Sequence, residues 1–595
     1  MRLGIALAIV LTWFVFSSAL VAAEAEMNET EKLQTFFEEE WEYGLKENPI
    51  KATLLGDLRY NGRLGDSSIA AIERRQRHGV EALRQLESID RSKLADSGKL
   101  NYDLYLENLT LRIEGHRFPW YLTPINQMGG VQQGPPNVVR SLPFRNAKHY
   151  EDYLSRLSQL PAVVDQTIER MQEGLKQRIT PPKITLRAVA EQIQAQIVSK
   201  VEESPFYRPF KNFPETVPLS EQERLRAAGK EAIEQSILPA YQKLHDFWVS
   251  EYYPNTRETI GLSSLPNGEQ WYAFGVKVST TTNLLPKEIH EIGLREVKRI
   301  RAEMDKIIKG SGFEGTRAEF FEFLRGDPQF YYSKPEHLLA GYRDICKRAD
   351  AELPKLFGKF PRLPYGVREV PEYSAPSQTT AYYHGGSLKA GRPGWFYANT
   401  YKLETRPKWE MEALAIHEAV PGHHLQIALA QEIEDVPKFR KHGHYTAFVE
   451  GWGLYSESLG EEMGFYNDPY SKFGQLTYEM WRAIRLVVDT GMHAFGWDRQ
   501  KAIDYFKANA GRHEHDITVE VDRYIVWPGQ ALAYKIGELK IKELRKFATK
   551  ELGDRFDIRG FHDTVLGSGA IPLSILEQNV KNYVAAEIKK MTQGN

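Results

Sequence analysis

The segment Ala413-Leu-Ala-Ile-His-Glu-Ala-Val-Pro-Gly-His-His-Leu-Gln426 places three histidines and a glutamate within eight residues of an apolar, helix-like stretch. Neutral imidazole nitrogens are good zinc ligands, and a carboxylate beside them can act as a general base on water that the metal activates. Helix capping or core packing does not need so many such residues together. The segment therefore predicts a metal site carried by a helical fold.

The spacing of the histidines leaves two choices for the second ligand. Zinc-binding histidine pairs usually lie four residues apart on one helix face, but the residue four after His417 is Pro421. Proline disrupts the helix and Gly422 permits unusual backbone angles, so the helix should be bulged or broken here. A bulge could bring His423 back over His417. His424 is the alternative because it shares a straight-helix face with His417, although about 10 Å further along the axis.

The third ligand is expected in the apolar segment Phe448–Glu457, which contains Glu450 and Glu457. A catalytic zinc site has three protein ligands and one open position. An unpaired carboxylate among apolar residues is costly unless it binds a cation, and this favours Glu450 as a ligand. Glu457 lies two turns further along the same face and is expected to support a ligand from behind. The alternative is that both are solvated surface charges.

The remaining chemistry is assigned to nearby polar residues. Glu418 is the predicted general base, taking a proton from water and passing it to the leaving amine. Oxyanion stabilisation needs hydrogen-bond donors, and the segment Asp522–Lys535 offers Arg523, Tyr524 and Tyr534.

A second group of residues is expected to contact the substrate. Residues 367–400 are rich in glycine, proline and aromatic residues, and they are the least helical part of the chain. Short strands are predicted there, and an edge strand can pair with a peptide backbone. Tyr382, Tyr383 and Arg392 are the predicted contacts, joined by His424 if it is not a ligand.

Bulk properties are those of an ordinary globular protein. The chain has 595 residues, with 42% hydrophobic and 26% charged residues and a formal net charge of −2. This balance gives no reason to expect nucleic acid as a partner. The only cysteine, Cys346, lies in a helical pattern and is expected to be a buried, inert thiol.

Helical periodicity dominates the rest of the chain. We predict a mainly α fold with a small β element near residues 365 to 400. Residues 1–23 have the basic start, apolar middle and small-residue end of a secretory signal peptide, with no cysteine near the expected cleavage point to mark a lipoprotein. The mature protein, periplasmic or secreted and without a membrane anchor, is divided into an N-terminal lobe (24–270) and a metal-bearing C-terminal lobe (271–595).

Four motifs resemble one known family. They are HEAVPGHHLQ (417–426), EGWGLYSE (450–457), RLVVDTGMHAFGW (485–497) and EVDRYIVWPGQALAYKIG (520–537). Together they look like the bacterial domain-of-unknown-function 885 family, most strongly from about 380 to 575. That family is grouped with the gluzincin zinc metallopeptidases, and the resemblance implies one zinc ion and peptide hydrolysis in a large helical fold with a deep central cleft.

The resemblance also assigns residues. Gluzincins carry a His-Glu-x-x-His motif and a later glutamate, which match His417, Glu418 and Glu450. The Gly-His pair of the motif matches Gly422 and His423, but two extra residues precede it, which leaves the second ligand open. The expected activity is hydrolysis of short peptides. The alternatives are a non-catalytic, metal-stabilised peptide-binding protein and a zinc amidase that acts on a non-peptide amide.

Overall fold

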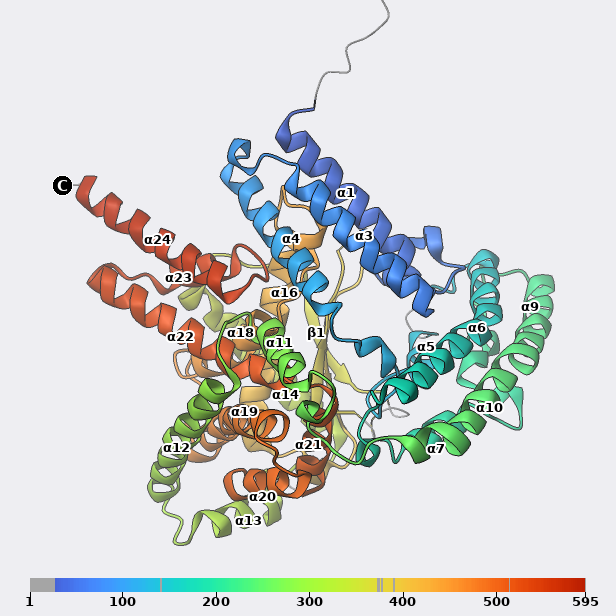
Figure 1. The fold of residues 1–595 in the computed structure, drawn as a ribbon. Coiled ribbons are helices and arrows are strands. Elements are labelled where there is room, and N and C mark those ends of the chain that lie inside the picture. Colours follow the sequence, from blue (N-terminus) through green and yellow to red (C-terminus); the bar gives the residue numbers. More distant parts are fainter. Residues whose placement is uncertain are drawn as a thin grey trace, which may run out of the picture.

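The protein is described here by a computed structural model that covers residues 27–139, 142–371, 375, 378–388, 391–512 and 514–593. The predicted signal peptide, residues 1–23, lies outside the described residues. The fold is mainly α with one small sheet, as the periodicity predicts (Figure 1). No helix in the described part of the chain is both long and apolar enough to cross a membrane.

The N-terminal helices form the upper layer in Figure 1. This layer consists of α1 (Glu29–Glu47), α2 (Pro49–Leu54), α3 (Ile69–Glu87) and α4 (Asp96–Gly115). Asn28 and Glu31 form a capping box that starts α1, and Leu33, Phe36 and Phe37 are buried along its inner face. Phe439, from the short helix between residues 438 and 441, packs against this small core.

A second core lies on the right of Figure 1 and is built from residues between Ile125 and Tyr252. Its helices are α5 (Gly134–Val138), α6 (Ala147–Gln177), α7 (Val189–Gln194), α8 (Arg208–Lys211), α9 (Leu219–Ala232) and α10 (Leu238–Phe247). The long helix α6 buries Leu157, Leu160 and Val164 against its neighbours, following the helical spacing of the sequence.

The remaining helices make the largest body, which carries the site. They are α11 (Gly268–Thr280), α12 (Pro286–Gly310), α13 (Arg317–Gly326), α14 (Pro335–Leu356), α15 (Met411–Glu418), α16 (His423–Glu432), α17 (Lys438–Lys441), α18 (Thr446–Leu459), α19 (Pro469–Ala494), α20 (Arg499–Asn509), α21 (Glu514–Val526), α22 (Ala533–Leu552), α23 (Ile558–Leu566) and α24 (Leu573–Gln593). Leu104 and Leu122 from the first half also enter this core. The boundary at residue 270 stays a prediction.

The sheet lies where the sequence predicts it and has the order β1-β3-β2. β1 (Tyr365–Glu369) runs parallel to β3 (Gly394–Ala398), and β2 (Ala381–His384) runs antiparallel to it, with Tyr382 opposite Tyr397. Phe396 in the central strand is completely buried and packs edge-on against Tyr342 of α14. The deep central cleft stays a prediction.

Cys346 is buried in α14, as expected. Burial raises the pKa of its thiol to about 12, so the thiol stays protonated at neutral pH and is a poor nucleophile.

Candidate metal centre

The helix that begins the site is broken at the predicted place. α15 ends at Glu418 and α16 begins at His423, and Ala419 has φ −100° and ψ −108°, outside helical values. The connection is held by two backbone hydrogen bonds: the Gly422 N–H donates to the Ile416 carbonyl over 3.0 Å, and the His424 N–H donates to the Ala419 carbonyl over 3.0 Å. The chain therefore starts a second helix in a new direction after His417.

A glycine is required in this connection. A Cβ atom on Gly422 would lie 1.9 Å from the His417 carbonyl oxygen and 2.4 Å from that of Ile416. Trp452 of α18 fixes the same turn, because its indole N–H donates to the Pro421 carbonyl over 2.8 Å. The break is thus stabilised by close backbone packing and by a side chain from the helix that carries Glu450.

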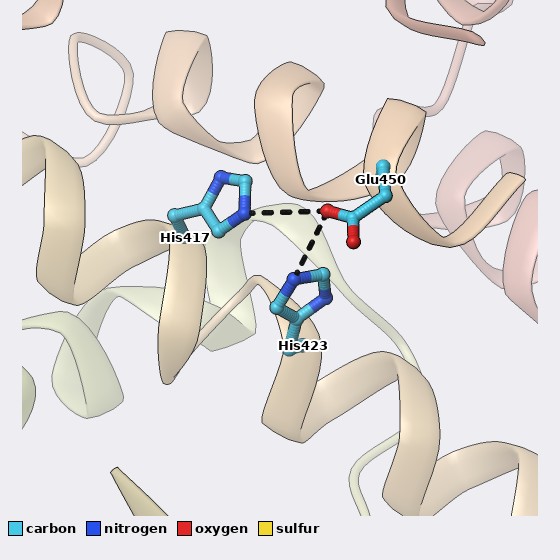
Figure 2. A group of neighbouring side chains, drawn as sticks. All are labelled: His417, His423 and Glu450. Atoms are coloured by element: carbon cyan, nitrogen blue, oxygen red, sulfur yellow. Dashed lines mark ion pairs between the residues drawn. The ribbon is translucent and has the colours of Figure 1, made fainter. Parts of the chain in front are cut away.

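The three predicted metal ligands come together at this break (Figure 2). One ligand atom each of His417, His423 and Glu450 lies within 4.8 Å of the other two. Glu450 Oε2 is 3.8 Å from His417 Nε2 and 3.5 Å from His423 Nε2. The imidazole rings are almost perpendicular, at 86°, with centroids 4.7 Å apart. Three helices, α15, α16 and α18, therefore each supply one donor.

Glu457 supports His417 from the other side of its ring. His417 Nδ1 lies 2.8 Å from Glu457 Oε1, and Glu457 is completely buried. When Nδ1–H donates to this carboxylate, the lone pair of Nε2 points to the cluster, which is the arrangement of metal-binding histidines. Gly453 makes room for the ring, because a Cβ there would lie 2.7 Å from His417 Cε1.

The electrostatics of the cluster are those of a site that attracts a cation. Burial alone favours the neutral form of His417, but the hydrogen bonds to Glu450 and Glu457 outweigh it and raise the pKa to about 9. Burial acts on Glu450 in the opposite sense, yet its contacts with His417 and His423 hold the pKa of its carboxyl well below the usual range. The carboxylates therefore favour positive charge between the two rings.

The donor set fits a zinc ion. In a tetrahedral site with bonds of about 2.0–2.1 Å, ligand atoms lie about 3.4 Å apart, close to the distances of Glu450 Oε2 from the two imidazole nitrogens. The His417 side chain is buried, whereas the Glu450 side chain is 18% exposed, so Glu450 is the ligand nearer to solvent of the two. His423 Nδ1 has no partner among the described protein atoms.

His424 lies outside this cluster. Its Nδ1 is 2.8 Å from the Tyr383 hydroxyl, and its ring lies 4.5 Å from that of Tyr365, which ties it to the sheet. Burial lowers the pKa of His424 to about 4, so it is neutral at physiological pH. Of the two candidates left open by the spacing, the geometry favours His423 as the second ligand.

The other predicted substrate contacts are found in and beside the sheet. Tyr382 stacks on Tyr397 with centroids 4.8 Å apart, on a different strand face from Tyr383. Arg392 forms a backbone bridge with Ser387, and its buried Nε has no partner among the described atoms. Their contact with a substrate stays a prediction.

The predicted oxyanion donors differ in how many hydrogen bonds they already make. Tyr524 is 1% exposed, and its hydroxyl accepts hydrogen bonds from Trp481 and Arg485 and donates to Glu520 over 2.7 Å. Three partners leave it little capacity for a reacting group.

The Tyr534 hydroxyl has fewer hydrogen-bond partners than that of Tyr524. It accepts a long, 3.4 Å hydrogen bond from Arg523, whose other donor bond goes to Gln530 over 2.8 Å. Of the predicted donors, Tyr534 therefore has the most freedom to donate, and the catalytic roles of all three residues stay predictions.

The sequence reasoning passed over Arg482, Arg485 and Arg512. Arg482 and Arg485 lie three residues apart on α19, and Arg485 begins the RLVVDTGMHAFGW motif; both contact the Tyr534 ring. Two arginines one turn apart among the apolar residues Met480, Trp481, Ala483, Ile484 and Leu486 were a usable signal. Their convergence with Arg512 depends on the packing of α19 against the segment before α21.

Fold and site together define a large, mainly helical protein with a buried His-His-Glu cluster of the metal-ligand type. The model of a family described as "Bacterial protein of unknown function (DUF885)" matches residues 49–580. The chain belongs to that family. No curated protein matches it.

Similar solved structures include the following two. A "putative lipoprotein" from Colwellia psychrerythraea is 28% identical, with a TM-score of 0.89 over 94% of this chain and 100% of the other. A second, from Shewanella oneidensis and described as a "putative lipoprotein of unknown function", is 16% identical, with a TM-score of 0.65 over 93% of this chain and 99% of the other. The second likeness concerns the fold alone.

Proposed function

We infer that the protein is a zinc-dependent hydrolase of peptide bonds in short peptides, with His417, His423 and Glu450 as ligands and Glu418 as general base. The observation that carries this proposal is the convergence of the three donor atoms within 4.8 Å, with Glu457 bound to the outer nitrogen of His417. Structural metal sites use all four positions for protein ligands, whereas three ligands with one open side favour a catalytic site.

A zinc ion held by these donors would polarise a substrate carbonyl and acidify water. Glu418 follows His417 directly at the end of α15 and is partly exposed, and its charge acts on the His417 imidazole. These features support Glu418 as the group that accepts a proton from water and returns it to the leaving amine. Tyr534 is the preferred donor to the oxyanion.

The rest of the proposal concerns location and partner. The signal-like residues 1–23 favour export, to the periplasm or outside the cell. Strand β2 lies at one edge of the sheet, and its Tyr383 contacts His424, the residue after His423. Such an edge supports an extended peptide as the substrate.

Metal content and peptide hydrolysis test this function together. The mature protein should hold one zinc ion per chain, His423→Ala should lose it, and the matched variant His424→Ala should keep it. Glu418→Gln should keep the zinc and lose about 10²- to 10⁴-fold in turnover of a peptide mixture, the usual contribution of a general base.

Different failures point to different alternatives. If zinc is lost only when His424 is replaced, the second ligand is His424 and not His423. Wild type that holds zinc but cleaves neither peptides nor simple amides would indicate the non-catalytic peptide-binding protein. A wild type that takes up no zinc would overturn the metal centre itself.

A further inference from the structure

A cavity of about 710 Å³ lies between the N-terminal helices and the part of the chain that leads into α18. Its walls come mainly from α1, α2, α3 and α4, the blue helices of Figure 1, and from residues 439–445. α17, which contributes Phe439 and Arg440 to the wall, packs against both α1 and α16. Because α16 begins with His423, the cavity adjoins a helix that carries a predicted metal ligand.

The cavity also extends to the start of α18, the helix that carries Glu450. His444 and Tyr445 line the cavity and directly precede this helix. His444 is exposed, and the charges of Glu450 and His423 act on its imidazole. Glu450 lies about 7.5 Å beyond Tyr445 along the helix axis, which is the length of about two to three residues of an extended peptide. A peptide that occupies the cavity therefore needs only a short extension to arrive at the metal centre.

The carboxylates that line the cavity already have partners. Glu40 is buried, and its carboxylate lies 2.6 Å from His78 Nε2 and 3.0 Å from the Tyr105 hydroxyl. Glu47 pairs with Arg75 over 3.2 Å. Among the described residues of the lining, these two are the carboxylates. Further cations in the wall therefore have no carboxylate of the lining left to pair with.

Two such cations are present in the wall. Lys51 and Arg112 line the cavity and are exposed. Neither side chain forms a hydrogen bond or an ion pair within the described part of the chain. Exposed ammonium and guanidinium groups without a counter-charge leave the cavity with an excess of positive charge, which attracts anionic ligands.

Both cations lie close to the segment that leads to the metal centre. Arg112 follows Asn108 by one turn of α4, and the Asn108 amide donates to the Tyr445 hydroxyl over 2.9 Å. Lys51 Nζ lies 5.6 Å from the centre of the Trp41 ring. That ring stacks on His442, with ring centroids 5.7 Å apart. The positive charge is therefore next to residues 442–445 and not at the far side of the N-terminal helices.

The rest of the wall suits a peptide better than a small inorganic anion. It includes the aromatic rings of Phe37, Trp41, Tyr105 and Phe439. The volume is within the range of about 300–1,000 Å³ that is common for ligand-binding cavities. Aromatic surface combined with a few charged groups favours a ligand that has an apolar body and a charge at a defined place.

We propose that this cavity binds a carboxylate of the peptide substrate through Lys51 and Arg112, so that the enzyme prefers acidic peptides. This inference rests on the proposed function, to which it adds the class of substrate. The carboxylate belongs either to an aspartate or glutamate side chain or to the end of the peptide, because both form the same charge-assisted hydrogen bonds with these cations. The cleaved bond then lies a few residues from the bound carboxylate.

Binding of three matched peptides to the zinc-loaded Glu418→Gln protein tests the proposal without turnover. The first is an N-acetylated neutral hexapeptide amide with glutamine at its second and fifth positions. The second has glutamate at both positions, and the third is the glutamine peptide with a free terminal carboxylate. Calorimetry should show one or both acidic peptides binding about 10-fold more tightly than the neutral amide, as expected for two exposed charge pairs. The acid that binds more tightly identifies the source of the carboxylate.

Replacing the two cations should abolish this preference. Lys51→Gln combined with Arg112→Gln should weaken the acidic peptides to the affinity of the neutral amide and leave the amide unchanged. Each single replacement should lower the preference about threefold, which keeps the test available if the double variant does not fold.

A matched control separates the cavity from the overall charge of the protein. Arg295→Gln combined with Lys298→Gln removes two cations of α12 that are also exposed and lack an ion pair among the described residues. This control changes the net charge by the same amount and should keep the full preference. An equal loss of preference in both double variants would overturn the proposal.

The remaining outcomes distinguish this inference from the proposed function. Equal binding of the three peptides, or binding of none of them, overturns the carboxylate site. A preference for acid that disappears only when Lys51 and Arg112 are replaced supports the site even if wild type cleaves nothing, in which case only the proposed function fails. Wild type that cleaves acidic and neutral peptides with equal kcat/KM keeps the proposed function and overturns this inference.

Discussion

At the scale of single residues, the site depends on pairs of side chains that fix one another. Glu457 orients His417, and the buried position of this carboxylate comes from α18 packing against α15. The sequence placed Glu457 behind a ligand from its spacing with Glu450 alone. It could not show which ligand, because that depends on where α15 meets α18.

Replacing Glu457 by glutamine should weaken zinc binding. Glutamine keeps the shape and an acceptor for His417 Nδ1–H but removes the charge that makes the ring a better ligand. Loss of such support typically costs 10- to 100-fold in metal affinity, measurable by competition with a chelator. Glu462→Gln, which removes a surface partner of Arg545, is the matched control. Wild-type affinity in Glu457→Gln would show that the carboxylate does not support the ligand.

At the scale of elements, the break between α15 and α16 decides the site. A continuous helix would carry His424 round to the face of His417, two turns away, whereas the break brings His423 within reach of Glu450. The close approach of α18 to α22 also uses glycine: a Cβ on Gly451 would lie 2.5 Å from Gly537 Cα. Small residues thus set the positions of the helices that carry the donors.

Gly422→Ala should therefore damage both stability and metal binding. The new methyl group would overlap the His417 carbonyl oxygen, and relieving this overlap means moving the ligand's own backbone. We expect a loss of about 3 kcal/mol in the free energy of unfolding, the upper end of overpacking effects, together with loss of zinc.

Gly310→Ala, at the end of α12 with nothing within 4 Å of the new Cβ, should change stability by less than about 1 kcal/mol. Chemical denaturation and metal analysis of the two variants give the comparison. Equal stability and zinc content of the two variants would mean that the connection between α15 and α16 is not as tightly packed as its geometry indicates.

At the scale of the whole molecule, Asp489 joins parts that are far apart in sequence. Its carboxyl accepts a 2.6 Å hydrogen bond from the Tyr272 hydroxyl of α11 and a 3.0 Å bond from the Gly529 N–H before α22. Burial raises the pKa of Asp489 to about 7, although both hydrogen bonds act to lower it. The acid is therefore largely neutral below neutral pH in the folded protein.

This raised pKa predicts a pH dependence of stability. The pKa of Asp489 in the folded protein lies above its ordinary value of 3.8. Its contribution to the free energy of unfolding is therefore fully present below about pH 4 and is lost as pH rises through 7. Asp489→Asn mimics the neutral acid at every pH. Relative to this variant, the wild-type protein should lose up to about 4 kcal/mol in free energy of unfolding between pH 4 and pH 7, and no more above pH 7.

Thermal unfolding midpoints of the two proteins across this range provide the measurement. Asp504→Asn, which removes an exposed carboxylate of α20, is the control and should run parallel to wild type. Parallel curves for wild type and Asp489→Asn would show that Asp489 is ionised throughout.

The residue types and the local structure of this protein could be predicted from its amino-acid sequence alone. Helical periodicity gave the mainly α fold, glycine and proline between 365 and 400 gave the sheet region, and Pro421 with Gly422 gave the broken helix. These are local properties, set by side-chain spacing and backbone freedom within a few residues.

Which of these residues contact one another depends on how the helices pack in three dimensions. It placed His423 beside Glu450, tied His424 to Tyr383, and gathered Arg482, Arg485 and Arg512 around Trp481. Such contacts depend on the crossing of helices far apart in the chain, which is set by packing of their surfaces and not by spacing along one segment.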